Sequence, residues 1–193
     1  MLPVRFLNTV IRLLKPIGIT LNPFMVVEEG QQAPALPTPA ANVQYSIADV
    51  DRIPELLTLL SPHTTASLEQ RFAEGKLCFV AEVDSRIGAI MWADTKAFNY
   101  PPNFFPLAQG EAYLFAAFAD RQLRGLNLTP ALRQFCYDTL RQQGVHTFYS
   151  YTDLTNTAAR RFKAKLNARE TQLRVYIAFG KIWSRTFTLR KYL

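Results

Sequence analysis

The sequence contains little of what metal and disulfide chemistry requires, with two cysteines and two histidines in 193 residues. Cys78 and Cys136 each lie inside an apolar run, LCFVAEV and LRQFCYDTL. No Cys/His spacing typical of a metal site is present, which argues against a metal centre. We therefore expect two buried, reduced thiols rather than a disulfide or a nucleophile, and no metal.

Long uninterrupted apolar runs are also absent, since no stretch reaches the roughly 18 residues of a transmembrane helix. The N-terminal MLPVRFLNTVIRLLKPIGI is interrupted by Arg5, Arg12, Lys15 and Pro16 and has no evident small-residue cleavage site. Its pattern predicts a short amphipathic helix that ends at Pro16. Two roles stay open for this helix: docking on the domain or a partner, or lying on an anionic membrane surface. We expect a cytoplasmic protein, with peripheral attachment to the inner membrane face as the alternative.

Acidic residues are scarce in the second half of the chain. From Ala119 onward there are 14 Lys/Arg and 4 Asp/Glu, a balance of +10, whereas the preceding residues carry 8 and 11, a balance of −3. A basic half indicates either an anionic partner or a solvated basic face.

A charge-free stretch rich in proline and alanine, GQQAPALPTPAAN at residues 30–42, predicts a linker. We accordingly divide the chain into an N-terminal amphipathic segment with linker (1–42) and one compact domain (43–193). The segment NPFMVVEE before the linker is either a strand or an extended arm.

Within the domain the apolar pattern predicts a mixed α/β (α+β) fold around one sheet. In chain order we expect a strand (VQYSI), two helices (ADVDRIPELLTLL and TTASLEQRFAEG), a hairpin that turns at 84–86, a long aromatic loop (95–110), a buried strand (EAYLFAAFA), a helix (NLTPALRQFCYDTLRQQG), a strand (VHTFYSYT), a helix (NTAARRFKAKLN) and a closing antiparallel pair. The loop, with Phe98, Tyr100, Phe104 and Phe105, is either a pocket wall or a surface flap.

The two best-known phosphate-binding motifs, GxxxxGK[ST] and GxGxxG, are missing. In their place DRQLRGLNLTPAL (120–132) joins a strand to a helix through a glycine and two arginines. Free N–H groups and the dipole at a helix N-terminus favour an anion. Alone, this turn predicts a phosphate site only weakly.

QLRGLN (Gln122 to Asn127) resembles the Q/R-x-x-G-x-G/A signature of the GNAT superfamily of coenzyme A-dependent N-acyltransferases. Further along, NTAARRFKAKLNA resembles that superfamily's N-x-x-A-x-x-L-Y-x-K-x-G-F helix. The resemblance implies a single domain whose mostly antiparallel mixed sheet splays between its fourth and fifth strands, Glu111–Ala119 and Val145–Thr152, with flanking helices.

The resemblance also implies a co-substrate, acetyl-CoA or another acyl-CoA, and an amine acceptor. The implied cofactor contacts are backbone groups near Ala117, Phe118 and Ala119, the pyrophosphate turn formed by Leu123, Arg124, Gly125, Leu126, Asn127, Leu128 and Thr129, and Asn156 on the pantetheine arm. This chain departs from the pattern at Asn127, where a small residue is usual, and at Lys163, where the family commonly has Tyr. Asn tolerates left-handed backbone. Lys163 could contact the nucleotide phosphates or be solvated, and we expect it to be solvated.

Acyl transfer to an amine needs a base, a polarised carbonyl and an acid for the leaving thiolate. Glu111, at the start of the fourth strand, is the first candidate for the base. Tyr149 and Tyr151 share one face of the fifth strand, so either could be the acid. The sequence does not identify the acceptor. The aromatic residues of the loop suit an apolar acceptor, either a small molecule or a cell-envelope compound.

Two other hypotheses remain at this stage. A degenerate acyltransferase fold would bind coenzyme A or a partner without catalysis. A nucleic-acid-binding module would use the basic half, but no recognised motif supports it, and we expect no nucleic-acid partner. A homodimer is left open.

Overall fold

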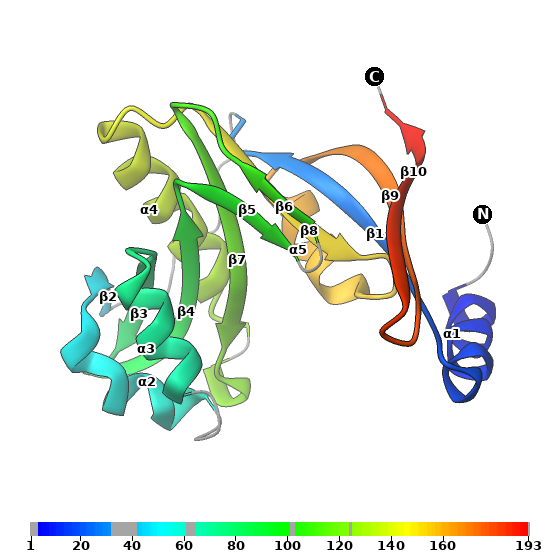
Figure 1. The fold of residues 1–193 in the computed structure, drawn as a ribbon. Coiled ribbons are helices and arrows are strands. Elements are labelled where there is room, and N and C mark those ends of the chain that lie inside the picture. The colour runs from blue at the N-terminus through cyan, green and yellow to red at the C-terminus, as the bar shows by residue number, and fades with distance from the viewer. Residues whose placement is uncertain (1–3, 32–41, 61–64, 101–102, 124, 193) are drawn as a thin grey trace.

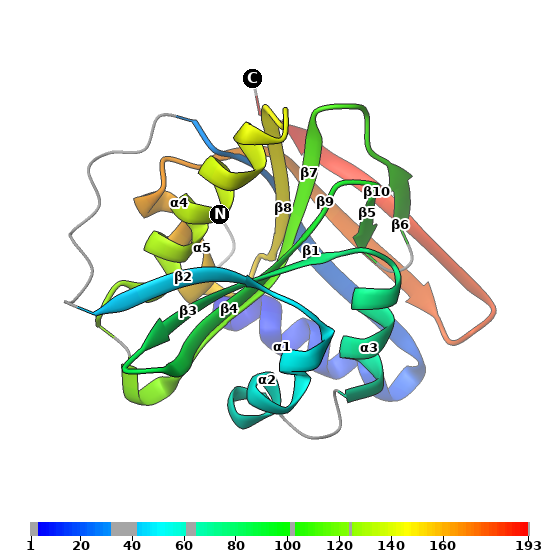
Figure 2. The same cartoon turned by 90° about the vertical axis from the view of Figure 1, so that its left-hand side faces the viewer.

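The computed structural model describes residues 4–31, 42–60, 65–100, 103–123 and 125–192. Eight strands form one sheet in the order β10-β9-β1-β8-β7-β4-β3-β2, and β5 and β6 form a separate hairpin (Figures 1 and 2). The strands are β1 (Ile19–Glu29), β2 (Val43–Ala48), β3 (Leu77–Val83), β4 (Arg86–Asp94), β5 (Ala97–Tyr100), β6 (Asn103–Pro106), β7 (Glu111–Ala119), β8 (Thr147–Asp153), β9 (Arg169–Phe179) and β10 (Trp183–Lys191).

The helices are α1 (Val4–Leu14), α2 (Ile53–Leu59), α3 (Thr65–Ala73), α4 (Leu128–Gln142) and α5 (Thr157–Lys165), with 3₁₀ turns η1 (Lys15–Ile17), η2 (Val50–Arg52) and η4 (Arg121–Leu123). Helices α4 and α5 cover one face of the sheet, whereas α2, α3 and the β5–β6 hairpin cover the other (Figure 2). The predicted mixed fold with a mostly antiparallel sheet is confirmed, because β7 and β8 form its one parallel pair between described strands. No helix among the described residues has the length and apolarity that a membrane crossing needs.

The structure differs in two details from the secondary structure that the sequence pattern predicts. The segment NPFMVVEE lies in β1, and β1 lies inside the sheet between β8 and β9. Residues 19–29 therefore belong to the sheet, although we grouped them with the N-terminal segment; most of the predicted linker, 32–41, lies outside the described residues. The predicted loop at 95–110 contains the β5–β6 hairpin, because both of its arms are rich in aromatic residues, which favour strands.

Separate cores fill the two faces of the sheet. On the α4 side, the core includes Phe79, Met91, Leu132, Tyr137 and Phe148. On the other face, Leu56 and Leu68 pack on Trp92 and its neighbours. Both cysteines are buried and free, as predicted, and burial raises the pKa of each thiol to about 12.

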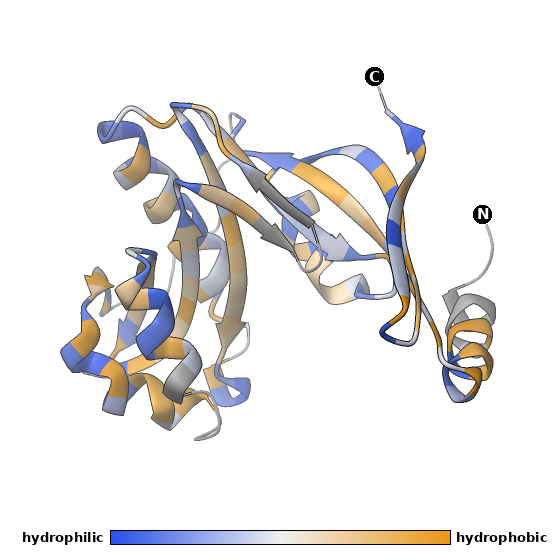
Figure 3. Ribbon diagram, in the orientation of Figure 1, coloured by the Kyte–Doolittle hydropathy of each residue, from blue (hydrophilic) through white to orange (hydrophobic). Residues whose placement is uncertain are grey.

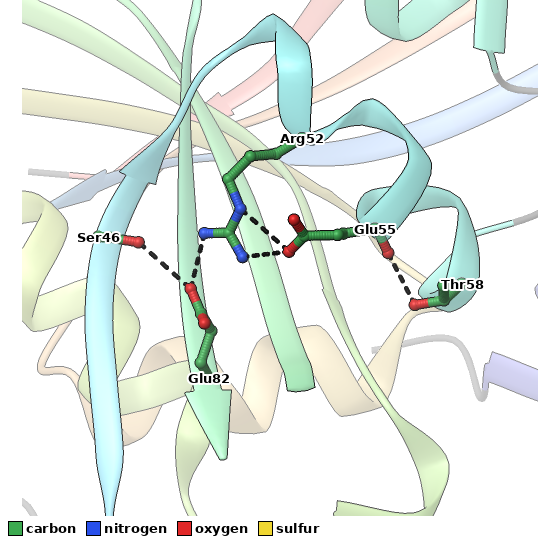
Figure 4. Close-up of polar contacts among 5 residues, drawn as sticks. All are labelled: Ser46, Arg52, Glu55, Thr58 and Glu82. Atoms are coloured by element: carbon green, nitrogen blue, oxygen red, sulfur yellow. Dashed lines mark hydrogen bonds and ion pairs between the residues drawn. The ribbon is translucent and has the colours of Figure 1, made fainter. Parts of the chain in front are cut away.

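A polar cluster anchors α2 to the outer strands. Arg52 Nη1 donates to Glu82 Oε1 on β3 at 2.7 Å, and Arg52 Nε donates to Glu55 Oε2 on α2 at 3.1 Å (Figure 4). The Ser46 hydroxyl on β2 donates to the same Glu82 oxygen at 3.5 Å. Arg52 thus joins a helix turn to the sheet through two carboxylates, at a partly exposed position.

Candidate functional site

The sheet opens where β7 and β8 diverge. The two strands pair over three positions only, from Glu111 opposite Thr147 to Tyr113 opposite Tyr149. Beyond them β7 continues along β4, and β8 continues along β1. The predicted splay between these strands is therefore present, and it leaves their C-terminal halves as the two walls of a V.

A bulge in β7 widens this opening. Phe115 pairs with Trp92 and Phe118 pairs with Ile90, so Ala116 and Ala117 both lie opposite Met91. Ala116 has a φ of 49°, a left-handed conformation that is uncommon for a residue with a side chain. Bulges turn backbone groups away from the ladder. Here the bulge lies at the point where β7 leaves β8, and the sequence gives no local signal for it.

A cavity of about 750 Å³ occupies the V. Its walls come from the second half of β7, the turn around Gly125, the start of α4, the end of β8 and one side of α5. We call it the β7–β8 cavity. Neighbouring residues on both strands line it, Leu114 with Phe115 and Tyr151 with Thr152. Because neighbours in a strand point to opposite faces, the cavity passes through the sheet from one face to the other.

Most of the predicted cofactor contacts meet in this cavity. Those that line it are Ala117, Ala119, Leu123, Gly125, Asn127, Leu128, Thr129 and Asn156. Phe118 and Leu126 are not among the lining residues: Phe118 is exposed and Leu126 packs against the core. Arg124 lies outside the described residues.

The turn before α4 has the predicted left-handed backbone. Asn127, the N-cap of α4, has φ 53° and ψ 25° and makes no side-chain capping hydrogen bond. Gly125 has a φ of 93°. The Asn in place of a small residue thus keeps a conformation that Gly usually provides, and the first N–H groups of α4 stay without a side-chain cap at the cavity wall.

Asn156 is the N-cap of α5, and its Oδ1 accepts a hydrogen bond from the Ala159 amide at 3.1 Å. Its acceptor is therefore used within the helix. The side-chain NH₂ group is the part of Asn156 left to donate into the cavity.

The three predicted catalytic residues separate into two places. Tyr151 lines the cavity, and burial raises the pKa of its phenol. Glu111 and Tyr149 are not lining residues; the Tyr149 hydroxyl donates to Glu111 Oε1 at 3.2 Å, at the closed end of the V. The other Glu111 oxygen accepts the Ala108 amide at 2.8 Å. Tyr149 and Tyr151 share a face, as predicted, and Phe148 and Ser150, which alternate with them along β8, are buried on the other face.

Sequence reasoning placed Lys163 in solvent, and this is wrong. Lys163 is 6% exposed and lines the cavity. Its Nζ donates to the Tyr151 carbonyl oxygen at 2.8 Å and to the Thr152 hydroxyl, and lies 3.7 Å from Glu29 Oε1. Burial, the largest cause, lowers the pKa of Lys163 to about 8. A lysine on a basic helix looks solvated in the sequence, but its helix packs this one against β8.

Glu29, at the end of β1, is the centre of a buried ionic cluster that the sequence did not reveal. Its Oε2 accepts the Tyr137 hydroxyl at 2.6 Å and lies 3.4 Å from Arg133 Nε; its Oε1 accepts the Ser150 hydroxyl. Burial by itself would raise the pKa of Glu29, but Arg133, Lys163 and the two hydroxyls outweigh burial and lower it.

This cluster contributes to the cavity wall through its cations. Arg133 is 2% exposed and lines the cavity, and within the described residues its Nε and Nη1 have no hydrogen-bond partner. Two cations and one carboxylate leave a net positive charge behind the wall. The wall therefore favours an anionic or carbonyl-rich ligand.

An aromatic cluster adjoins the cavity through Phe115 and Tyr151, which line it. Tyr113 stacks on Phe115 with ring centroids 5.2 Å apart and on Tyr151 at 6.2 Å, and Phe98 of the β5–β6 hairpin lies 4.4 Å from Tyr113. Phe98 packs in this aromatic cluster but does not line the cavity, so the pocket-wall role of the loop stays a prediction. The side chains of Tyr100, Phe104 and Phe105 lie outside the described residues. Within the described chain no group of three or more metal-ligating side chains gathers.

The fold can now be compared with known proteins. No family model and no curated protein matches the sequence. Solved structures do match. A GNAT-family acetyltransferase from Colwellia psychrerythraea superposes with a TM-score of 0.61 at 15% identity, covering 90% of this chain and 62% of that one. The chain has the fold of the GNAT-family acetyltransferases.

Two further acetyltransferase structures extend this similarity. A GNAT-family protein from Novosphingobium aromaticivorans gives a TM-score of 0.57 at 15% identity over 82% of this chain, which spans 65% of that protein's length. An aminoglycoside 6'-N-acetyltransferase from Acinetobacter baumannii gives 0.55 at 17% identity, covering 67% of this chain and 92% of the other. At such identities the likeness concerns the fold.

Proposed function

We propose that the chain is an acyl-CoA-dependent N-acyltransferase, with acetyl-CoA or another acyl-CoA as donor and the amine of a small-molecule or cell-envelope compound as acceptor. The observation that carries this proposal is the β7–β8 cavity, which crosses the sheet between a helix N-terminus on one face and an aromatic cluster on the other. A cofactor and an acceptor can meet there from opposite sides.

In this proposal the pyrophosphate lies over the start of α4. The amides of Leu128 and Thr129 are free of intrahelical partners and lie at the positive end of the helix dipole. Pro130 has no N–H and suits the first turn. The pantetheine arm follows the edge of β7 near Ala117 and Ala119, and Asn156 donates to it from α5. Arg133 Nη1 supplies a further donor inside the cavity.

The reaction is a direct attack of the amine nitrogen on the thioester carbonyl carbon. The C–N bond forms, the C–S bond breaks, a base takes a proton from the amine, and the thiolate is protonated. We assign the proton donor to Tyr151, because it lines the cavity and its raised pKa keeps its hydroxyl protonated. Glu111 would act through water from the closed end of the V, with Tyr149 orienting it.

Calorimetric titration with acetyl-CoA and longer acyl-CoAs tests the binding step. We expect a Kd in the micromolar range and release of one free thiol per acyl group when a panel of amines is added. Binding without thiol release for any amine would favour a fold that binds coenzyme A without catalysis. Failure to bind any thioester at high micromolar concentration would contradict the proposal.

A matched pair of glycine variants tests the location of the pyrophosphate. Gly125 and Gly144 both have a positive φ, 93° and 87°, and an added Cβ would meet nothing within 4 Å at either. Gly125→Trp and Gly144→Trp thus carry similar backbone strain, but only Gly125 lines the cavity. We expect only Gly125→Trp to lose affinity for acyl-CoA. Equal affinities in the two variants would place the cofactor elsewhere.

The tyrosines allow a similar comparison for catalysis. Tyr151→Phe should lower kcat by about 10²-fold or more with little change in KM, in line with the usual contribution of a general acid. Tyr149→Phe should have a smaller effect, because its hydroxyl contacts Glu111 outside the cavity. The opposite ranking would move the chemistry to the closed end of the V.

A further inference from the structure

Exposed apolar side chains gather at one edge of the molecule. Seven of the ten large apolar residues described as exposed lie in α1, η1 and the β9–β10 hairpin with its turn: Leu13, Ile17, Phe179, Ile182, Trp183, Phe187 and Leu189. Ile182 is 84% exposed and Leu13 is 70% exposed, values that make them solvent-facing rather than peripheral to a core. We call this surface the terminal edge.

The N-terminal segment and the β9–β10 turn meet at the terminal edge. The Gly180 amide in the turn of the hairpin donates to the Gly18 carbonyl oxygen after η1 at 2.8 Å, and β1 pairs with β9 along its length. Figure 1 shows α1 beside the tip of the β9–β10 hairpin, and Figure 3 shows apolar residues on both. Strand β10 is the outermost strand of the sheet, so its far edge has no strand partner in the order given above.

The chain segments that form the terminal edge also contain the excess of positive charge. Residues 1–27 and 171–193 contain eight Lys/Arg and no Asp/Glu. The remaining residues contain 14 Lys/Arg and 15 Asp/Glu, which nearly cancel. Exposed cations among the described residues of these segments are Arg12, Lys15, Lys181, Arg185, Arg190 and Lys191. Apolar exposure and positive charge therefore coincide.

The combination of exposed apolar side chains and positive charge indicates which kind of partner the terminal edge could bind. A second copy of the chain would bring one cationic edge against another, which like-charge repulsion disfavours. A nucleic acid would pair with the cations but would leave aliphatic side chains such as Ile182 and Leu13 without an apolar partner. An anionic bilayer offers both, since its headgroups attract Lys and Arg and its acyl boundary takes apolar side chains.

We propose that the terminal edge binds peripherally to the surface of an anionic phospholipid bilayer. The hairpin turn with Ile182 and Trp183 enters the headgroup region together with Leu13 and Ile17, and the surrounding Lys and Arg contact anionic headgroups. The chain does not cross the bilayer in this arrangement. The proposal stands apart from the acyltransferase function, because the terminal edge shares no residue with the β7–β8 cavity.

The full chain offers a built-in probe for the test. It has two tryptophans, of which Trp92 is fully buried and Trp183 is 46% exposed. With vesicles that mix phosphatidylcholine and anionic phosphatidylglycerol, we expect sedimentation with the vesicles and a blue shift of tryptophan emission. Pure phosphatidylcholine vesicles should bind weakly, and high salt should reduce binding. Trp183→Phe should remove the blue shift while sedimentation persists.

Two variants and one control test whether the terminal edge is the surface that binds the vesicles. Ile182→Asp should weaken vesicle binding, and Lys181→Glu with Arg185→Glu should weaken it by at least about tenfold, because each basic residue near an anionic bilayer contributes strongly. Val50→Asp makes the same apolar-to-acidic change at another exposed site, 50% exposed in η2, and should bind like the unaltered chain. Circular dichroism checks that all variants are folded.

Several results would overturn the proposal. These are equal affinity for neutral and anionic vesicles, no binding to either, or unchanged binding of Ile182→Asp. A dimer in analytical ultracentrifugation that Ile182→Asp disrupts, without vesicle binding, would make a second copy the occupant. Binding to an oligonucleotide that is tighter than to vesicles and equally sensitive to Lys181→Glu would make a nucleic acid the partner.

Discussion

Two ionic clusters in this protein contain similar residues but lie in different surroundings. Arg52, Glu55 and Glu82 form ion pairs at the surface beside α2 (Figure 4). Glu29, Arg133 and Lys163 form ion pairs in the interior, behind the cavity wall. Surface pairs are screened and solvated, so they contribute little, whereas removing one member of a buried pair leaves an uncompensated charge. Burial, rather than the number of contacts, therefore decides which cluster contributes more to the stability of the fold.

The largest effect is expected from Glu29→Gln. This change keeps the shape of the side chain but leaves Arg133 and Lys163 buried without a carboxylate, at a cost of about 3–5 kcal/mol. Urea unfolding followed by circular dichroism measures the loss. Because the cost arises from the buried cations, adding Lys163→Met should recover part of the lost stability. A double variant as unstable as the sum of the two single ones would show that the charges are not coupled.

The next effect is a pH dependence that belongs to Lys163. Its folded pKa, about 8, lies below its ordinary value of 10.5, so between these pH values the unfolded chain binds more protons and stability rises with pH. Over this whole pH interval, the free energy of unfolding rises by roughly 3 kcal/mol. Above pH 9 the raised pKa values of Cys78 and Cys136 act in the opposite direction.

The difference between the unaltered chain and Lys163→Met isolates this contribution, since both contain the cysteines. We expect the stability difference to change in favour of the unaltered chain from pH 8 to pH 9.5, measured by urea unfolding at each pH. A constant difference over this range would mean that Lys163 titrates normally.

The third effect concerns the cavity. Arg133→Met removes Nε and Nη1, which have no hydrogen-bond partner among the described residues, and leaves Glu29 with Lys163. We expect a smaller stability loss than for Glu29→Gln and about tenfold weaker acyl-CoA binding, the effect of one lost bond to a charged donor. Calorimetric titration measures the affinity. Unchanged affinity would make Arg133 a structural partner of Glu29 and nothing more.

How much of this could be predicted from the sequence depends on the range of the contacts. Some features are local: the turn at Asn127, the helix after it and the strand alternation around Tyr149 and Tyr151. For these, the local sequence pattern is enough to predict the structure. The Glu29 cluster depends on residues more than a hundred positions apart, and no periodicity relates them. The bulge at Ala116 depends on how β7 leaves β8, and Ala-Ala is compatible with a regular strand.

The smallest effect should come from the surface cluster. Arg52→Met removes the ion pairs to both Glu55 and Glu82, yet we expect a loss of about 1 kcal/mol or less, because water and salt already weaken these pairs. Acyl-CoA affinity should be unchanged, since Arg52 does not line the cavity. Urea unfolding at low and high salt provides the measurement, and the small loss should shrink further at high salt. If Arg52→Met instead destabilised the chain as much as Glu29→Gln, burial could not be what distinguishes the two clusters. The anchoring of α2 would then carry a larger share of the stability than partly exposed ion pairs supply.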